Sequence, residues 1–386
     1  MTVTILDWPN NDAIDPFDNQ YPQYFCPVDI LEGQAPLHNA HLAMFEAAEN
    51  VTLLFNTKGN QLIKEDGRIT GLFATGEGGK VIKINATNGV VISAGDYMGN
   101  DEMRDYYQKA SYLFPTYVWT SFDNDGNSTS NGSGICMGLW AGAKVEDSEH
   151  SQMVHGFGGG LGFDPFLFVD GHGERFMNEN SRGDLFSIVT SRAAGKCFWQ
   201  IFDANYADQV ATMPAGHACC YKVVEDAAEE PWGNFLGTGI RTVAEVEEDC
   251  DCICDTIEEL AEQMGVDYET LQATIDRYNE LAAKGVDEDF GKRADLLYPI
   301  EQPPFYASKN TPEGQMRFCA LTGLWSDSEA RVYTDDNEVL PGLYAAGNSQ
   351  GCRFSVDYAT TYMGASHGMA MTYGYIAGKN AAAKLS

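Results

Sequence analysis

Short apolar runs separated by turn residues occupy the chain between residues 51 and 95. Runs of this length, bounded by glycine and polar residues, are typical of strands. They predict strands at residues 51–56, 61–64 and 68–74, the last two joined by a turn at Asp66-Gly67. Further apolar runs, 82–86 and 89–95, follow. Directly before the strand predicted at residues 51–56, apolar positions with helical spacing predict a helix over residues 37–50.

A second informative pattern lies near the end of the chain. Residues 342–346 form an apolar run that stops at Gly347, as a buried parallel strand does where it meets a ligand crevice. A helix is predicted over residues 364–379, with Ser366 as its N-cap. Free N–H groups at a helix start favour an electron-rich acceptor. The small residues at both places therefore predict that a flat, polar ligand approaches the main chain here.

Size and charge narrow the class of protein. A chain of 386 residues with 44% hydrophobic residues can bury a large core and is expected to form two domains. A net charge of −32 argues against nucleic acid and anionic membrane surfaces as partners. No apolar run is long enough for membrane insertion, and the first residues lack the features of a signal peptide. Ten scattered cysteines favour a reduced state and, by default, the cytoplasm.

Two short motifs invite a metal interpretation, and neither supports it. Asp123, Asp125 and Asn127 alternate as in a calcium loop, but Gly134 stands where an EF-hand needs glutamate. The run Cys250-Asp-Cys-Ile-Cys254 lacks the paired spacing of zinc sites, and its alternation suits a strand with all three thiols on one face. We therefore predict no metal.

Several motifs resemble one family, and they follow in the family's order. They are Gly89-Val-Val-Ile-Ser-Ala-Gly95, Gly132-Ser-Gly-Ile-Cys-Met-Gly138, Gly173-Glu-Arg-Phe-Met-Asn-Glu179, Gly342-Leu-Tyr-Ala-Ala-Gly347 and Gly364-Ala-Ser-His-Gly368. The chain resembles the FAD-dependent fumarate reductase, urocanate reductase and 3-ketosteroid dehydrogenase superfamily. The resemblance implies an α/β fold with FAD as cofactor. It implies a Rossmann-like FAD-binding domain at residues 1–145 and 319–386, and an inserted α+β capping domain at residues 146–318.

One element of the family pattern is missing from this sequence. The family begins with a strand, a G-x-G-x-x-G turn and a helix that hold the pyrophosphate of FAD. Neither Gly156-Phe-Gly-Gly-Gly160 nor Gly132-Ser-Gly134 has that spacing after a strand. The predicted Rossmann-like domain is therefore incomplete, which is expected of a fragment, a mis-started gene model or one piece of a split protein.

The resemblance also implies which residues contact the flavin. In the family, a helix start points at the C2 carbonyl of the isoalloxazine, and the ends of two strands touch the cofactor through backbone. The matching positions in this chain are Ala94, Gly95, Gly347, Asn348, Gly364, Ala365, Ser366 and His367.

Arg182 and His155 match catalytic positions of the family, each displaced by one residue. Arg182 follows Asn178-Glu179 and matches the family's proton donor, with a structural arginine paired to Glu179 or Asp184 as the alternative. His155 matches a histidine that binds substrate, with a structural role as the alternative.

Tyrosines replace the groups that bind dicarboxylates in the family's fumarate reductases. Tyr362 stands at the place of their second carboxylate-binding arginine, and Cys319 or its neighbour stands at the place of a histidine. Fumarate is therefore not the expected substrate. Tyr358 and Tyr362 are candidates for polarising a ketone or moving a proton, with aromatic packing as the alternative. Arg353 orients substrate or anchors its own loop, and the sequence leaves both open.

These observations predict an FAD-dependent oxidoreductase that reduces, or forms, a carbon-carbon double bond conjugated to a carbonyl or carboxylate. The expected partners are a small-molecule enoate or enone and an external electron donor or acceptor. The alternative is a truncated or split flavoprotein piece that is inactive without an upstream polypeptide.

Overall fold

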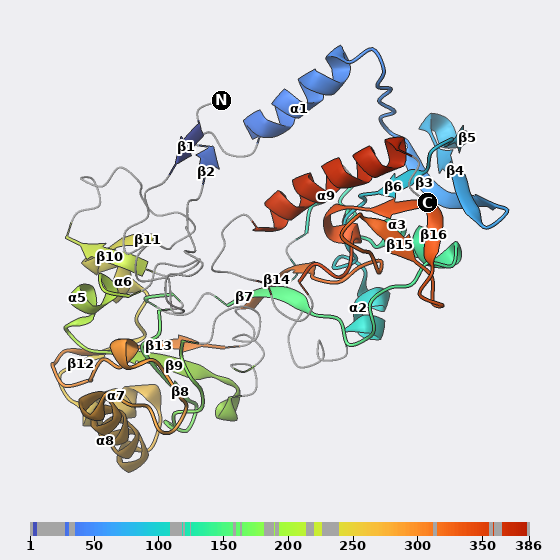
Figure 1. Cartoon of the computed structure of the whole chain (residues 1–386). Coiled ribbons are helices and arrows are strands. Elements are labelled where there is room, and N and C mark those ends of the chain that lie inside the picture. Colours follow the sequence, from blue (N-terminus) through green and yellow to red (C-terminus); the bar gives the residue numbers. More distant parts are fainter. Residues whose placement is uncertain are drawn as a thin grey trace.

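The computed structural model describes residues 3–5, 28–30, 35–108, 118, 120–123, 125–156, 160–162, 164–180, 189, 193–213, 220–225, 239–311, 315–354, 358 and 365–383. Most of their helices and strands form two groups, one from the middle of the chain and one from segments on either side of it (Figure 1). Strands β7, Gln152–Gly156, and β14, Gln315–Ala320, pair antiparallel and lie between the two groups.

An antiparallel sheet in the order β3-β4-β5 belongs to the first group. Its strands are Lys58–Glu65, Arg68–Thr75 and Val81–Asn85. Asp66 and Gly67 join the first two with φ of +50° and +79°, and positive φ at both residues is what a two-residue hairpin turn requires. Leu62 and Ile69 are buried on its inner face. The strands predicted at 61–64 and 68–74, and the turn between them, are therefore confirmed.

A second sheet, in the order β15-β16-β6, carries the predicted C-terminal strand. Its strands are Arg331–Tyr333, Val339–Ala345 and Val90–Ile92. β16 runs parallel to β6, with Leu343 opposite Val90 and Ala345 opposite Ile92. Parallel strands require a crossover connection, and here that connection contains the entire middle group. Residues 342–345 are all buried, as the apolar run predicted.

Two helices pack on this sheet: α3, Ser133–Trp140, and α9, Ala365–Ala382. Ala377 of α9 lies in a buried cluster with Tyr344 of β16. α3 approaches β6 so closely that a Cβ on Gly134 would come within 2.8 Å of Ile92 Cγ2, so only glycine fits there. Four further elements precede α3 in the chain: β1 Val3–Ile5, β2 Val28–Ile30, α1 Ala35–Ala47 and α2 Asp101–Tyr107.

The middle group contains a sheet in the order β12-β13-β9-β8, antiparallel throughout. Its strands are Cys252–Cys254, Phe305–Asn310, Phe198–Phe202 and Leu167–Asp170. Helices α7, Ile257–Met264, and α8, Tyr268–Lys284, pack against it (Figure 1). α8 buries Leu271, Ile275, Tyr278 and Leu281, which share one face of the helix. The smaller elements of this group are α5 Tyr206–Val210, β10 Cys220–Val224, β11 Gly239–Thr242 and α6 Val243–Glu248.

Three local predictions need correction. Residues 51–56 form no strand: Leu54 and Phe55 are exposed, and the segment pairs with no neighbouring strand. Ser366 is not the N-cap, because α9 begins at Ala365 and Ser366 lies within its first turn. Cys250 lies before β12, so only Cys252 and Cys254 share the buried face of that strand.

Candidate functional site

The ends of β6 and β16 meet, and hydrogen bonds join the segments that follow them. The N–H of Ala346 donates to the carbonyl oxygen of Ile92 at 2.9 Å. The hydroxyl of Ser349 donates to the carbonyl oxygen of Gly95 at 2.8 Å. Two segments about 250 residues apart in the sequence therefore leave the sheet side by side.

Both glycines at these strand ends have a backbone that side chains disfavour. The φ of Gly95 is +81° and that of Gly347 is +62°. A Cβ on Gly95 would meet no atom within 4 Å, and one on Gly347 would lie 3.9 Å from the Cβ of Ala370 in α9. Ala94 is exposed. The main chain at this edge is thus open to a flat ligand, and the second turn of α9 faces it.

The N-terminus of α9 is joined to a tyrosine of the preceding loop. The N–H of Ser366 donates to the phenol oxygen of Tyr358 at 3.1 Å. The ring of Tyr358, which is buried, meets that of Phe354 edge-on with centroids 4.9 Å apart. Ala365 and Ser366 are half-buried, whereas His367 is exposed. Tyr358 therefore lies at the positive end of the helix predicted to face the cofactor.

A chain of polar side chains lies behind the two glycines. Asp96 accepts the N–H of Met98 at 2.8 Å and the side-chain amide of Asn348 at 3.1 Å. The oxygen of Asn348 in turn accepts from Arg353 at 3.4 Å. Burial raises the pKa of Asp96 to about 6, although these hydrogen bonds act in the opposite direction. The sequence analysis gave Asp96 no role, and the only signal was a carboxylate directly after a strand-ending glycine.

The raised pKa predicts that Asp96 makes stability depend on pH. The ordinary pKa is 3.8 and the folded value about 6, so this contribution is fully present below 3.8 and is lost as the pH rises through 6. The shift corresponds to about 3 kcal/mol. Asp96→Asn should remove this dependence, measured by urea unfolding at several values between about pH 4 and about pH 7. Asp105→Asn, at an exposed position, should leave it unchanged. If the free energy of unfolding changed with pH equally in Asp96→Asn and in the original chain, the pH dependence would not come from Asp96.

The structure describes the other predicted site residues only in part. Arg182, Tyr362 and Gly364 lie outside the described residues. His155 lies in β7, opposite Met316 of β14, and its backbone alone is described.

His150, five residues before His155, packs and hydrogen-bonds within the fold. Its ring stacks on Tyr107 with centroids 4.4 Å apart, and its two nitrogens lie 2.8 Å from the Tyr97 hydroxyl and 2.8 Å from the carbonyl oxygen of Glu146. Burial lowers the pKa of His150. Both nitrogens are therefore used within the fold.

A buried ionic cluster orders the segment that precedes Arg182. Arg175 donates to both oxygens of Glu179 at 2.7 and 2.8 Å and to both oxygens of Asp287 at 3.0 and 2.8 Å. Lys292 lies 3.3 Å from Glu179 and donates to Tyr278 at 2.7 Å. Burial lowers the pKa of Lys292 to about 8. Glu179 thus has Arg175 and Lys292 as partners, which fixes residues 175–179 against α8 and the loop after it.

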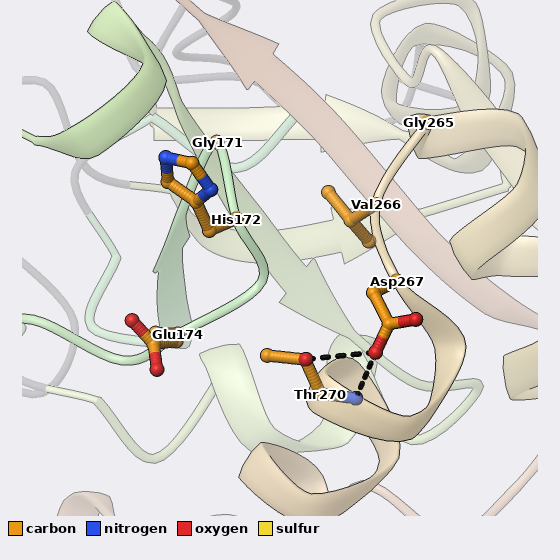
Figure 2. Close-up of a pocket in the computed structure, with 7 residues that line it drawn as sticks. All are labelled: Gly171, His172, Glu174, Gly265, Val266, Asp267 and Thr270. Carbon is orange, nitrogen blue, oxygen red and sulfur yellow. Dashed lines mark hydrogen bonds between the residues drawn. The ribbon is translucent and has the colours of Figure 1, made fainter.

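The hollow shown in Figure 2 belongs to the middle group and is distinct from the strand ends. It encloses about 340 Å³ and is lined by Gly171, His172, Glu174, Gly265, Val266, Asp267 and Thr270. One carboxylate oxygen of Asp267 accepts the N–H and the hydroxyl of Thr270, at 2.9 and 2.8 Å. This carboxylate caps α8, so it serves the helix and not a ligand.

The motifs considered for metal binding have local partners. Asp123 accepts the N–H groups of Asp125 and Asn127 at 3.0 and 2.8 Å, so the loop folds around its own carboxylate. Burial raises the pKa of the Cys252 thiol to about 11, which keeps it protonated. Among the residues that the structure describes, no group of three or more His, Cys, Asp or Glu side chains is arranged to hold a metal ion.

The residues present fit the ring end of a flavin. Gly95 and Gly347 carry no side chain that would keep a ligand from the main chain, Asn348 supplies an amide, and α9 begins beside them. An isoalloxazine is flat and carries carbonyl oxygens and ring nitrogens along one edge, which main-chain N–H groups and a helix N-terminus match. The two strand ends and this helix define a mixed helix and sheet protein whose parallel strands end at the position where such sheets bind nucleotides.

Comparison with known proteins identifies the family. The family model described as "FAD binding domain" matches residues 23–368, and the chain belongs to this family. Membership confirms the predicted resemblance and FAD as the cofactor.

The relatives are oxidoreductases by name. The chain is 29% identical over 393 residues to 3-oxosteroid 1-dehydrogenase of Mycolicibacterium smegmatis, covering 91% of this chain and 62% of that protein. It is 28% identical over 346 residues to NADH:acrylate oxidoreductase of Vibrio harveyi, covering 86% of this chain and 30% of that protein. The chain therefore spans less than two thirds of these relatives. Neither match supports the alternative of an inactive piece.

A solved structure supports the fold. The 3-ketosteroid-delta4-(5alpha)-dehydrogenase of Rhodococcus jostii matches with a TM-score of 0.63 and 22% identity, covering 90% of this chain and 62% of that one. This likeness confirms a mixed helix and sheet fold of the FAD-dependent dehydrogenase type. Within the described parts of the chain, none of the helices combines the length and the apolar character needed to cross a bilayer.

Proposed function

We propose that this chain forms the flavin-contacting and substrate-covering parts of an oxidoreductase that reduces, or forms, a carbon-carbon double bond conjugated to a carbonyl or carboxylate. The observation that carries the proposal is the meeting of Gly95, Gly347 and the start of α9 at one open edge of a parallel strand pair. Support comes from relatives named for acrylate, whose double bond is conjugated to a carboxylate, and for 3-oxosteroids, which carry a ketone.

The division into domains is part of the proposal. Residues 1–145 and 319–386 would form an incomplete Rossmann-like FAD-binding domain, and residues 146–318 would form an α+β cap over it. Support comes from the buried clusters: one draws its members from residues 62–145 and 320–345, and another draws only on residues 167–307. Each region therefore has its own core.

In the FAD-binding part, we assign the flavin contacts to the two strand ends and the start of α9. These contacts are Ala94, Gly95, Gly347, Asn348, Gly364, Ala365, Ser366 and His367. Bound FAD supplies the hydride donor or acceptor. The positive end of α9 would stabilise the negative charge that a reduced isoalloxazine carries near its C2 carbonyl.

The remaining groups would act on the substrate. In reduction, the hydride adds to one alkene carbon, and a proton adds to the other. Arg182 would give that proton and regain one from solvent. Tyr358 and Tyr362 would hydrogen-bond the carbonyl, which polarises the double bond, and His155 would hold the substrate. Electrons would come from, or go to, an external partner.

Two further assignments rest on sequence. By the resemblance, Tyr362 and either Phe318 or Cys319 stand where the family's fumarate reductases carry arginine and histidine, so a bulky or aromatic substrate suits the site better than fumarate does. The scattered cysteines favour a reducing compartment, and we propose the cytoplasm.

The activity is testable with the purified chain, FAD and a reduced viologen dye under argon. Oxidation of the dye should depend on a bulky or aromatic enone or enoate and should not occur with fumarate, a small dicarboxylate. Arg182→Ala should lower kcat by about 100-fold or more, because the proton donor is lost. Arg293→Ala, which removes an arginine paired with Asp295 on the surface, should leave kcat unchanged. A chain that binds FAD but turns over no conjugated alkene in either direction would contradict the proposal.

A further inference from the structure

Arg353 is a half-buried cation with incomplete hydrogen bonding. Its Nε donates to the carbonyl oxygen of Gln350 at 2.8 Å, and one terminal nitrogen reaches Asn348 at 3.4 Å. The other terminal nitrogen is buried and has no hydrogen-bond partner. None of the described carboxylates lies within ion-pair distance of it. A guanidinium held in this way has a donor and a charge available for a ligand.

The two carboxylates that interact electrostatically with Arg353, Asp96 and Glu146, accept hydrogen bonds from other residues. Asp96 accepts from Met98 and Asn348. Glu146 accepts the N–H of Gly323 at 3.1 Å. Burial raises the pKa of both carboxyls, which weakens their ability to balance the guanidinium. Burial also lowers the pKa of Arg353, because its positive charge is poorly solvated.

The surroundings of Arg353 place this charge beside the proposed flavin site. Its guanidinium lies 4.9 Å from the centroid of the Phe354 ring, and Phe354 meets Tyr358 edge-on. Tyr358 is hydrogen-bonded to the start of α9, while Asn348 follows the end of β16. One cation and two aromatic rings, from residues 353, 354 and 358, are therefore connected to the elements assigned to the isoalloxazine.

We infer that Arg353 binds the carboxylate of an α,β-unsaturated monocarboxylic acid, whose apolar body packs on Phe354 and Tyr358. This inference rests on the proposed function and narrows its substrate class. A carboxylate accepts two parallel N–H groups from one guanidinium and neutralises its charge. A ketone would accept a single hydrogen bond and leave the buried charge unbalanced.

The first test compares substrates that share one alkene and differ in charge. With cinnamate, Arg353→Gln should raise KM by about 10- to 100-fold, since a charge-assisted pair is lost. With the neutral ketone 4-phenyl-3-buten-2-one, KM should change by less than about 3-fold. With cinnamate, the KM of Arg353→Lys should lie between those of Arg353→Gln and the original chain. Arg293→Gln should leave the KM of both substrates unchanged. Equal effects on the acid and the ketone would overturn the inference.

A second measurement needs no turnover and so separates this inference from the proposed activity. Calorimetric titration of the FAD-loaded chain with 3-phenylpropanoate, the saturated acid, should show binding that Arg353→Gln abolishes and Arg353→Lys weakens. The amide of the same acid should bind at least about 10-fold more weakly. If the original chain binds acid and amide equally, Arg353 is not a carboxylate site, whatever the chain catalyses. Circular dichroism will show whether Arg353→Gln is folded. If it is not, Arg353→Lys and the comparison of acid with amide on the original chain test the inference.

Discussion

Glu179→Ala is expected to lower the free energy of unfolding by about 3–5 kcal/mol. The substitution leaves Arg175 and Lys292 buried with Asp287 as their only remaining carboxylate in the cluster. Two cations would then share one anion in the interior, and Arg175 and Lys292 would repel each other. Because the cluster holds residues 175–179 in place, the same variant should also disturb the segment that leads to Arg182.

The effect can be measured by urea unfolding, followed by tryptophan fluorescence, to which Trp199, buried in the same group of strands, contributes. Glu280→Ala provides the matched control, because Glu280 is exposed and pairs with Arg277 on the surface of α8. Its expected cost is below about 1 kcal/mol. Similar midpoints for the two variants would show that the buried cluster does not stabilise the fold.

Gly347→Val is expected to weaken FAD binding by about 100-fold or more, equivalent to about 2.7 kcal/mol. Valine disfavours the φ of +62° at this position, and its methyl groups would enter the space between the strand end and Ala370 of α9. The isoalloxazine would then lose its close approach to the main chain.

Gly78→Val separates the loss of the ligand site from general backbone strain. Gly78 has a comparable φ of +69°, and a Cβ there would meet no atom within 4 Å. It lies in an exposed turn between β4 and β5, away from the strand ends. Both variants should lose similar stability, but only Gly347→Val should lose affinity for FAD, measured by quenching of flavin fluorescence. Equal losses of affinity would mean that Gly347 has no special relation to the cofactor.

Local patterns predicted the elements that depend on local contacts. The hairpin around Asp66-Gly67 is set by residues close in sequence. The run 51–56 has the same apolar character but no partner strand, and pairing with a distant strand cannot be read from a local pattern. The N-cap was wrongly predicted at Ser366, which lies inside the first turn of α9, because small residues mark a helix boundary only weakly.

The site itself depends on contacts that only the fold reveals. The resemblance located Gly95 and Gly347, but the hydrogen bond between Asp96 and Asn348 joins residues 252 positions apart. Likewise, Glu179 lay in a recognised motif and was considered as a partner of Arg182. Its observed partners include Lys292, 113 positions further along the chain. The chain has 56 acidic and 24 basic residues, so charge alone could not predict which of them pair.

The most direct test of the account is amide hydrogen exchange of the chain with and without FAD. Exchange should slow in residues 93–96, in residues 347–350 and in the first two turns of α9, because these main-chain N–H groups line the proposed isoalloxazine site. Slowing confined to other segments, with these three unchanged at saturating FAD, would contradict it.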